Sequence, residues 1–133
     1  MSTLAVATIK SASSSAPTIQ NTSGTEIGRF ARTWCRFNGT GTVSIEDSFN
    51  VSSITDNGTG NYTVNFSNNF ANSNYSFAMT SNAPVNSGQS PQMHCITSCQ
   101  GTSTSGISYD IFHPQQSASF GRADGSTCGL IIC

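Results

Sequence analysis

The fold is decided by residues 37–77, where one four-residue turn sequence occurs twice, as Asn38-Gly39-Thr40-Gly41 and Asn57-Gly58-Thr59-Gly60. Asn-Gly between runs of alternating apolar residues indicates a β-hairpin, because the tight hairpin turns need residues that tolerate positive φ. The stretch therefore predicts compact all-β architecture.

Short strands are predicted on both sides of these turns. In residues 61–66, Tyr62, Val64 and Phe66 alternate with polar residues, and this period of two predicts a half-buried antiparallel strand. Residues 27–37 fit both a helical and a strand period, and their aromatic and threonine content favours the strand. Further candidate strands are residues 42–49, 75–79, 93–97, 106–113 and 128–133.

Residues 42–49 contain one irregularity. Val43 and Ile45 share a face that Glu46 and Asp47 interrupt, which predicts a β-bulge or an exposed strand end. Phe49, Val51 and Ile54 then resume the apolar register.

About seven short strands with regularly spaced turn signals predict an antiparallel β-sandwich or a small jelly-roll-like barrel, with an extended N-terminal arm. The predicted division is an arm at residues 1–26 and a β-sandwich domain at residues 27–133. Residues 128–133 are expected to close the sheet as its last strand. Edge strands need cover, and neighbouring copies of the chain could supply it.

The predicted arm contains an apolar segment with Leu4, Val6 and Ile9, followed by a run rich in serine and alanine. Such a stretch has no core of its own, so it is expected either to become ordered against a partner or a second copy, or to remain a frayed terminus. We expect the apolar segment to act as an assembly arm.

Composition excludes several functions. Charged residues make up 8 % of the chain and the formal net charge is −1. With only five lysines and arginines, the chain has no basic surface for nucleic acid. No segment has the length of a membrane span or the basic and apolar regions of a classical signal peptide, so no membrane partner is expected. A net charge near zero favours contact between copies.

The five cysteines, Cys35, Cys95, Cys99, Cys128 and Cys133, have neither the even count nor the spacing of a disulfide framework. Reduced, mostly buried thiols are expected. His94, Cys95, Cys99 and His113 lack the paired spacing of a structural zinc module, so no metal or other cofactor is expected.

An enzyme is not expected. The only dense acidic pair is Glu46-Asp47, whose adjacent side chains would point to opposite faces of a strand, and no local motif singles out a nucleophilic cysteine.

Two groups of residues are candidates for binding. The first, Arg29, Arg32, Trp34 and Arg36, combines guanidinium groups with an aromatic ring. It could contact a glycan, a carboxylate or a neighbouring subunit, or it could be a solvated strand face. We favour the subunit contact, because arginine and tryptophan are enriched in interfaces.

The second group, Tyr109, His113, Phe120 and Arg122, lies where loops of a rigid β scaffold would present a receptor or partner site. The alternative is that its aromatic residues pack the end of the sheet.

Two runs also resemble virion appendage proteins of tailed bacteriophages, often described as tail-fibre or phage structural proteins. They are Trp34-Cys35-Arg36-Phe37-Asn38-Gly39-Thr40-Gly41-Thr42-Val43 and residues 49–66, from Phe49-Asn50-Val51-Ser52-Ser53-Ile54 through the second turn to Phe66. The lead-in at residues 17–28 is similar as well, so the resemblance covers about residues 1–80.

The resemblance implies a β-rich, non-enzymatic virion component, often homotrimeric, that attaches through its N-terminal segment and presents its C-terminal half outward. The chain lacks the long repetitive shaft of a tail fibre. A capsid decoration or cement protein that stabilises the head is therefore an alternative, and a lectin-like glycan-binding module is a second. Expected partners are the chain itself, other capsid or tail proteins, and a host surface glycan.

Overall fold

The structure, a computed structural model, describes residues 6, 8–10, 18–28, 30–82, 96–114 and 120–133. The chain divides into two compact units, Met1–Ala31 and Arg32–Cys133. The described residues form strands, turns and loops without a helix, which confirms the predicted all-β class. The described part of the chain therefore contains no helix that could cross a membrane.

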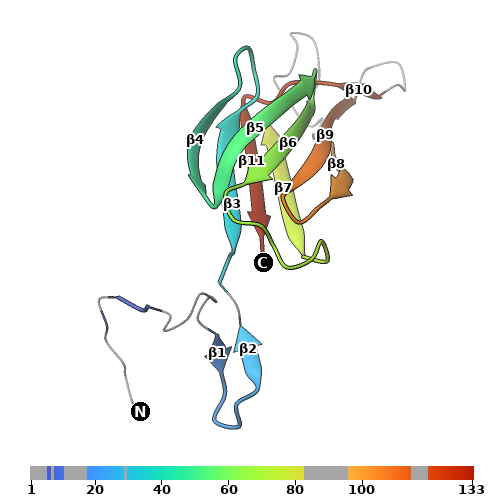
Figure 1. The fold of residues 1–133 in the computed structure, drawn as a ribbon. Coiled ribbons are helices and arrows are strands. Elements are labelled where there is room, and N and C mark those ends of the chain that lie inside the picture. Colours follow the sequence, from blue (N-terminus) through green and yellow to red (C-terminus); the bar gives the residue numbers. More distant parts are fainter. Residues whose placement is uncertain (1–5, 7, 11–17, 29, 83–95, 115–119) are drawn as a thin grey trace. The chain divides into compact units, whose positions relative to one another are not determined.

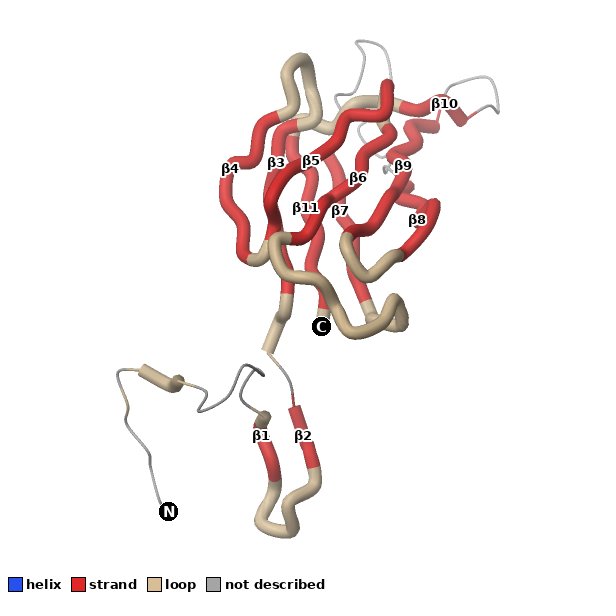
Figure 2. The backbone as a smooth tube through the Cα atoms, viewed as in Figure 1, coloured by secondary structure: helices blue, strands red, loops and turns tan. Residues whose placement is uncertain are grey.

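The second unit is an antiparallel β-sandwich, as predicted (Figure 1). One sheet has four strands, in the order β4 (Ser44–Phe49), β3 (Thr33–Asn38), β11 (Thr127–Ile132) and β7 (Phe77–Asn82). The other sheet has five strands, with the order β10 (Phe120–Arg122), β9 (Gly106–Pro114), β6 (Asn61–Phe66) and β5 (Val51–Gly58), and with β8 (Ile96–Thr102) also paired to β9. In Figure 2 the connections between strands gather at the two ends of the sandwich.

Strand β9 is the centre of the five-stranded sheet. Phe112 pairs with Ile96 of β8 and also with Arg122 of β10, so β8 and β10 lie on opposite sides of β9. Strand β6 pairs with β9 from Asn61 opposite Asp110. Strand β10 therefore continues the line of β6 along the same edge of β9.

The core lies between the two sheets and follows from the alternation of each strand. In β6 the alternate residues Tyr62, Val64 and Phe66 are buried, as predicted. The ring of Phe37 meets that of Tyr62 edge to face at 5.3 Å between centroids. The other buried apolar residues are Cys35, Phe70, Ile107, Tyr109, Ile111, Cys128, Leu130 and Ile132.

The chain passes from one sheet to the other at Asn50. This residue has a positive φ of 59°, a conformation that asparagine tolerates better than most residues. Its side-chain amide donates to Thr33 Oγ1 at 2.9 Å, and its Oδ1 accepts from the Asn68 backbone N–H at 2.7 Å. These bonds hold the corner between β4 and β5.

The last strand occupies an unexpected place. Residues 127–132 form β11, but β11 pairs with both β3 and β7 and so lies in the interior of its sheet. The prediction that it closes the sheet is wrong. Its alternate residues Cys128, Leu130 and Ile132 are buried, because they face the core between the two sheets.

The first unit contains a two-stranded hairpin within its described residues. β1 (Ile19–Gln20) pairs with β2 (Glu26–Gly28). Their connection is tied by Asn21, whose backbone N–H donates to the Thr25 carbonyl at 2.9 Å and whose Oδ1 accepts from the Ser23 N–H at 3.0 Å. The hairpin overlaps the end of the segment predicted as an extended arm, residues 1–26, which stays a prediction.

Candidate functional site

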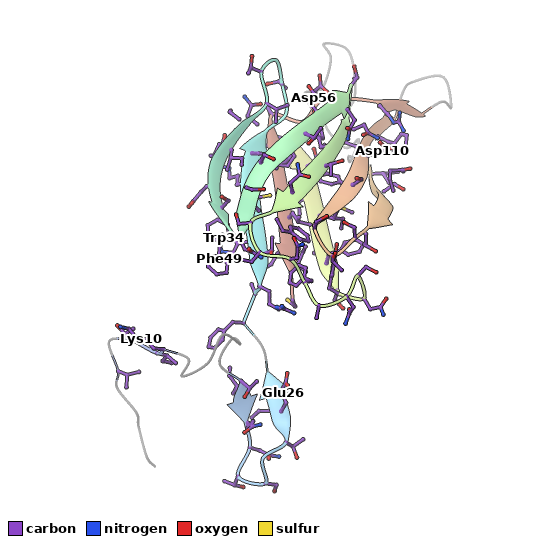
Figure 3. The ribbon with its side chains drawn as sticks, in the orientation of Figure 1. Lys10, Glu26, Trp34, Phe49, Asp56 and Asp110 are labelled. Atoms are coloured by element: carbon purple, nitrogen blue, oxygen red, sulfur yellow. The ribbon has the colours of Figure 1, made fainter. Side chains whose placement is uncertain are left out.

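The outer face of the four-stranded sheet carries a line of apolar side chains. Trp34 of β3 pairs with Phe49 of β4 on one side and with Ile131 of β11 on the other, and Ile131 pairs with Ala78 of β7. Directly paired residues point to the same face of a sheet, so the four residues form a line across all four strands, here called the outer apolar row. Phe49 is 55 % exposed and Ile131 is 44 % exposed, and Figure 3 labels Trp34 and Phe49 side by side.

A β-bulge in β4 places Phe49 in the outer apolar row. Phe37 pairs with Ile45, whereas the preceding residue Arg36 pairs with Asp47. Glu46 is therefore an extra residue on the β4 side. This confirms the bulge expected at the acidic pair.

The bulge changes the face to which Phe49 belongs. Ile45 and Phe49 are four residues apart and would share one face of a regular strand. One extra residue reverses that relation, so Ile45 pairs with the buried Phe37 while Phe49 pairs with Trp34. The expectation that Phe49 shares a register with Val51 and Ile54 is wrong.

Charged residues border the outer apolar row. Arg36 Nε donates to Glu46 Oε2 at 2.6 Å, and both side chains are exposed, at 61 % and 39 %. Asp47 lies opposite Arg36 in the ladder. One cation and two anions thus lie beside the apolar line.

The predicted cluster of arginines is divided by the fold. Trp34 and Arg36 lie on the outer face of β3, as described above. The guanidinium of Arg32 instead lies 4.4 Å from the ring centroid of Phe70, where a cation–π contact engages it. Arg29 lies outside the described residues.

The outer face of the five-stranded sheet is chemically different. Thr63 Oγ1 and Ser108 Oγ are 2.8 Å apart, and Asn57 Nδ2 donates to the same threonine oxygen at 2.9 Å. Asn65 Nδ2 donates to Ser53 Oγ at 3.1 Å and to Thr55 Oγ1 at 2.9 Å. This polar ladder consists of neutral hydroxyl and amide groups that are hydrogen-bonded to one another.

At one end of this face lies a buried carboxylate. Asp110 is 1 % exposed, and it accepts from Asn61 Nδ2 at 2.5 Å and from Arg122 NH2 at 2.7 Å. The Arg122 side chain is 48 % exposed. Arg122, predicted for a partner loop, is thus engaged in holding β10 to β9.

The prediction that Tyr109 belongs to a partner-binding loop is wrong. Its side chain is fully buried, because Ile107, Tyr109 and Ile111 alternate on the inner face of β9. Burial raises the pKa of Tyr109, and its Oη has no hydrogen-bond partner among the described residues. Tyr109 is a core residue.

The other two members of that group are placed only by their backbones. His113 pairs with Gly121, and Phe120 pairs with Pro114, in the β9–β10 ladder. Both belong to strands and not to a loop. Their side chains lie outside the described part of the structure.

The first unit exposes apolar side chains. Val6 is 52 % exposed and Ile9 is 63 % exposed, while Leu4 lies outside the described residues. In the hairpin and just after it, Ile27 and Phe30 are 64 % and 50 % exposed. An isolated two-stranded hairpin is marginally stable in water, so this unit has apolar surface that a partner could cover.

The four described thiols differ in burial. Cys35 and Cys128 are buried, and Cys99 and Cys133 are exposed, so the expectation of mostly buried thiols holds for two of the four described. Burial, with a smaller contribution from the neighbouring Cys128, raises the pKa of Cys35 to about 12. The Cys35 thiol is therefore un-ionised at neutral pH and a poor nucleophile.

Among the described residues, no three side chains of His, Cys, Asp or Glu gather closely enough to hold a metal ion. Two residues of the weak zinc pattern, His94 and Cys95, lie outside the described part of the chain.

Comparisons with protein families, curated proteins and solved structures give no significant match to this chain.

Proposed function

We propose that the chain is a non-enzymatic structural component of a tailed-phage virion, a short fibre or spike-type appendage that assembles as a homotrimer. The resemblance of residues 1–80 suggests the virion and the trimer. The observation that carries the structural role is the outer apolar row, which continues across all four strands of one sheet. Phe49 and Ile131 are exposed, with the half-buried Trp34 between them, and an apolar patch of this kind marks an interaction surface.

A second copy of the chain is the occupant we propose for this surface. Trp34 and Phe49 are residue types that form the centres of interfaces. Arg36 beside Glu46 and Asp47 provides both signs of charge within one patch, so the cation of one copy could pair with an anion of the next copy around a threefold axis. The formal net charge of −1 opposes this contact only weakly.

The first unit is proposed to attach the appendage to the particle. Val6 and Ile9 would become buried against another virion protein, by strand addition or by simple apolar contact. The sandwich would then project outward, toward a host surface glycan in the fibre role.

A truncation tests the attachment. A chain that lacks residues 1–26 is expected to fold as a sandwich but to be lost from purified particles. The full chain with Val6→Ser and Ile9→Ser is a matched variant, because it keeps the length and removes only the apolar side chains. Full occupancy of both variants in particles would overturn the attachment role.

The position of the chain in the particle tests the appendage role. Antibody labelling followed by electron microscopy should place the chain on the tail. Labelling of the head surface, together with particles that lose heat resistance but still adsorb when the chain is missing, would replace this proposal by the capsid decoration role.

A further inference from the structure

The two copies of the Asn-Gly-Thr-Gly turn have the same local sequence and different surroundings. Both lie in hairpins of the sandwich, the first between β3 and β4 and the second at the end of β5. Gly41 and Gly60, at the fourth position of each turn, both have positive φ, of 66° and 63°. The turns differ at the second position, where Gly58 has a φ of 119° and Gly39 has no positive φ, and they differ in their contacts.

Hydrogen bonds hold the first turn against the rest of the sandwich. The Gly39 N–H donates to the Gly125 carbonyl at 2.8 Å, and the Gly39 carbonyl accepts from Tyr62 Oη at 2.9 Å. Asn38 Oδ1 accepts from the Thr40 N–H at 2.9 Å and from its hydroxyl at 2.7 Å. The side-chain amide of Asn38 and the nitrogen of Gly39 are therefore both held.

A third Asx-Gly pair, Asp124-Gly125, is held in the same assembly. Asp124 Oδ1 accepts from the Gly60 N–H at 2.7 Å and from Tyr62 Oη at 2.8 Å. A side chain on Gly125 would collide with Ser81 and Cys128. Contacts with neighbouring residues therefore hold the backbone of Asp124 and Gly125 in place.

In the second turn Gly60 is held by Asp124, whereas Asn57 and Gly58 are exposed. Asp56 pairs with Tyr62 and Gly58 pairs with Asn61, so Asn57 is a bulge residue without a partner in the ladder. Residues 55–59 are exposed, and no atom lies within 4 Å of the position of a Cβ on Gly58. The Gly58 N–H donates to the exposed carboxylate of Asp56 at 2.9 Å.

We propose that Asn57 is a site of spontaneous backbone modification, by deamidation through a cyclic imide. The Gly58 nitrogen attacks Cγ of Asn57, the Cγ–Nδ2 bond breaks, and ammonia leaves. The proton lost by the Gly58 nitrogen has an acceptor nearby in Asp56 Oδ1. Water then adds to one of the two imide carbonyls and opens the ring to aspartate or to isoaspartate.

Glycine follows asparagine at both turns and leaves the attacking nitrogen unhindered, so the local sequence does not distinguish Asn57 from Asn38. Three features of the structure favour the reaction at Asn57. At Asn57 the attacking nitrogen is outside the interior and bonded to a carboxylate, whereas at Asn38 the nitrogen of Gly39 is buried and bonded to a backbone carbonyl. The bulge at Asn57 also allows the longer isoaspartate backbone without a shift in the pairs on either side.

The product would change the outer polar face. The bond from Asn57 Nδ2 to Thr63 Oγ1 would be lost, and a second carboxylate would stand beside Asp56. Since Asn57 belongs to no core contact, the sandwich is expected to remain folded. The modification would therefore alter the charge of one hairpin and leave the architecture intact.

Peptide mapping by mass spectrometry tests the proposal on the full chain, incubated in mildly alkaline buffer. In the folded protein, the peptide with Asn57 should convert at least about tenfold faster than the peptide with Asn38, a difference in barrier of about 1.4 kcal/mol. The same chain in denaturant is the matched control, because there the two identical turn sequences should convert at similar rates.

The Asn57→Gln variant gives a second control. It keeps an amide but disfavours the five-membered ring, so the product at this position should disappear while the rate at Asn38 stays the same. Conversion of Asn38 as fast as Asn57 in the folded chain would overturn the proposal. So would an intact Asn57 over a time in which both sites convert in denaturant.

Discussion

The two outer faces of the sandwich follow the same rule of alternation and carry opposite chemistry. On the four-stranded sheet, the outward positions bring Phe49, Trp34 and Ile131 into the outer apolar row. On the five-stranded sheet, the outward positions bring hydroxyl and amide groups such as Thr63 and Asn65 into a ladder of mutual hydrogen bonds. The inner faces form the core, and the difference between the outer faces is the reason why we propose the outer apolar row as the contact surface.

The largest expected effect is the change of stability with pH that Cys35 causes. Cys35 lies between the outward residues Trp34 and Arg36 of β3. Cys35 faces the core, and burial raises its pKa from 9.0 to about 12. Because the folded state keeps a proton that the unfolded chain loses, this contribution to stability is complete below about pH 9 and disappears as pH rises toward about 12. The free energy of unfolding should fall by up to about 1.4 kcal/mol per pH unit in this window.

Denaturant titrations across this pH range measure the slope. Cys35→Ala should be less stable at neutral pH but should show a shallower alkaline decline. An equal decline in the two proteins would mean that Cys35 is not sealed inside the sandwich, and the assignment of inner and outer sides of β3 would fail.

The next effect compares the ion pairs of the two faces. Arg122 pairs with a carboxylate that is 1 % exposed, whereas Arg36 pairs with one that is 39 % exposed. Removing the partner of a buried charge is costly, so Arg122→Ala should lower the free energy of unfolding by about 1.5–3 kcal/mol. Arg36→Ala should lower it by less than about 1 kcal/mol.

Urea denaturation of the two variants gives both values under one condition. Similar losses would contradict the contrast between the faces, because they would place the two carboxylates in comparable environments.

The smallest effect concerns the polar ladder. Thr63→Val keeps the shape of the side chain and removes the hydroxyl that contacts both Ser108 and Asn57. The expected loss of stability is about 1 kcal/mol, measured by thermal or urea denaturation. Thr102→Val, at an exposed position of β8 outside these hydrogen bonds, is the matched control and should change stability less. Equal effects would mean that the ladder adds nothing to stability.

Local sequence was sufficient for much of the fold. The alternation of Tyr62, Val64 and Phe66 predicted β6 with its bounds. The acidic pair after Ile45 predicted either a bulge or an exposed strand end, and β4 has the bulge. Both are properties of one strand and its own side chains.

The features that were missed depend on pairing between distant segments. The central place of β11 requires both β3 and β7 as neighbours, and the burial of Tyr109 requires the opposite sheet. Trp34 and Arg36 could be singled out from composition, but Phe49 and Ile131 join them only through the register of three strands. The spacing of these residues along the sequence does not predict that register.

We propose that the outer apolar row is a contact between copies of the chain, and sedimentation equilibrium of the purified chain tests this proposal most directly. The wild-type chain should form a homo-oligomer, a trimer in our proposal. Trp34→Ser should weaken association by at least about 30-fold, the loss of about 2 kcal/mol expected of an interface centre. Thr55→Ala, on the polar face, should associate like the wild type. A wild-type chain that stays monomeric at high concentration, or a Trp34→Ser chain that associates as tightly as the wild type, would contradict the account.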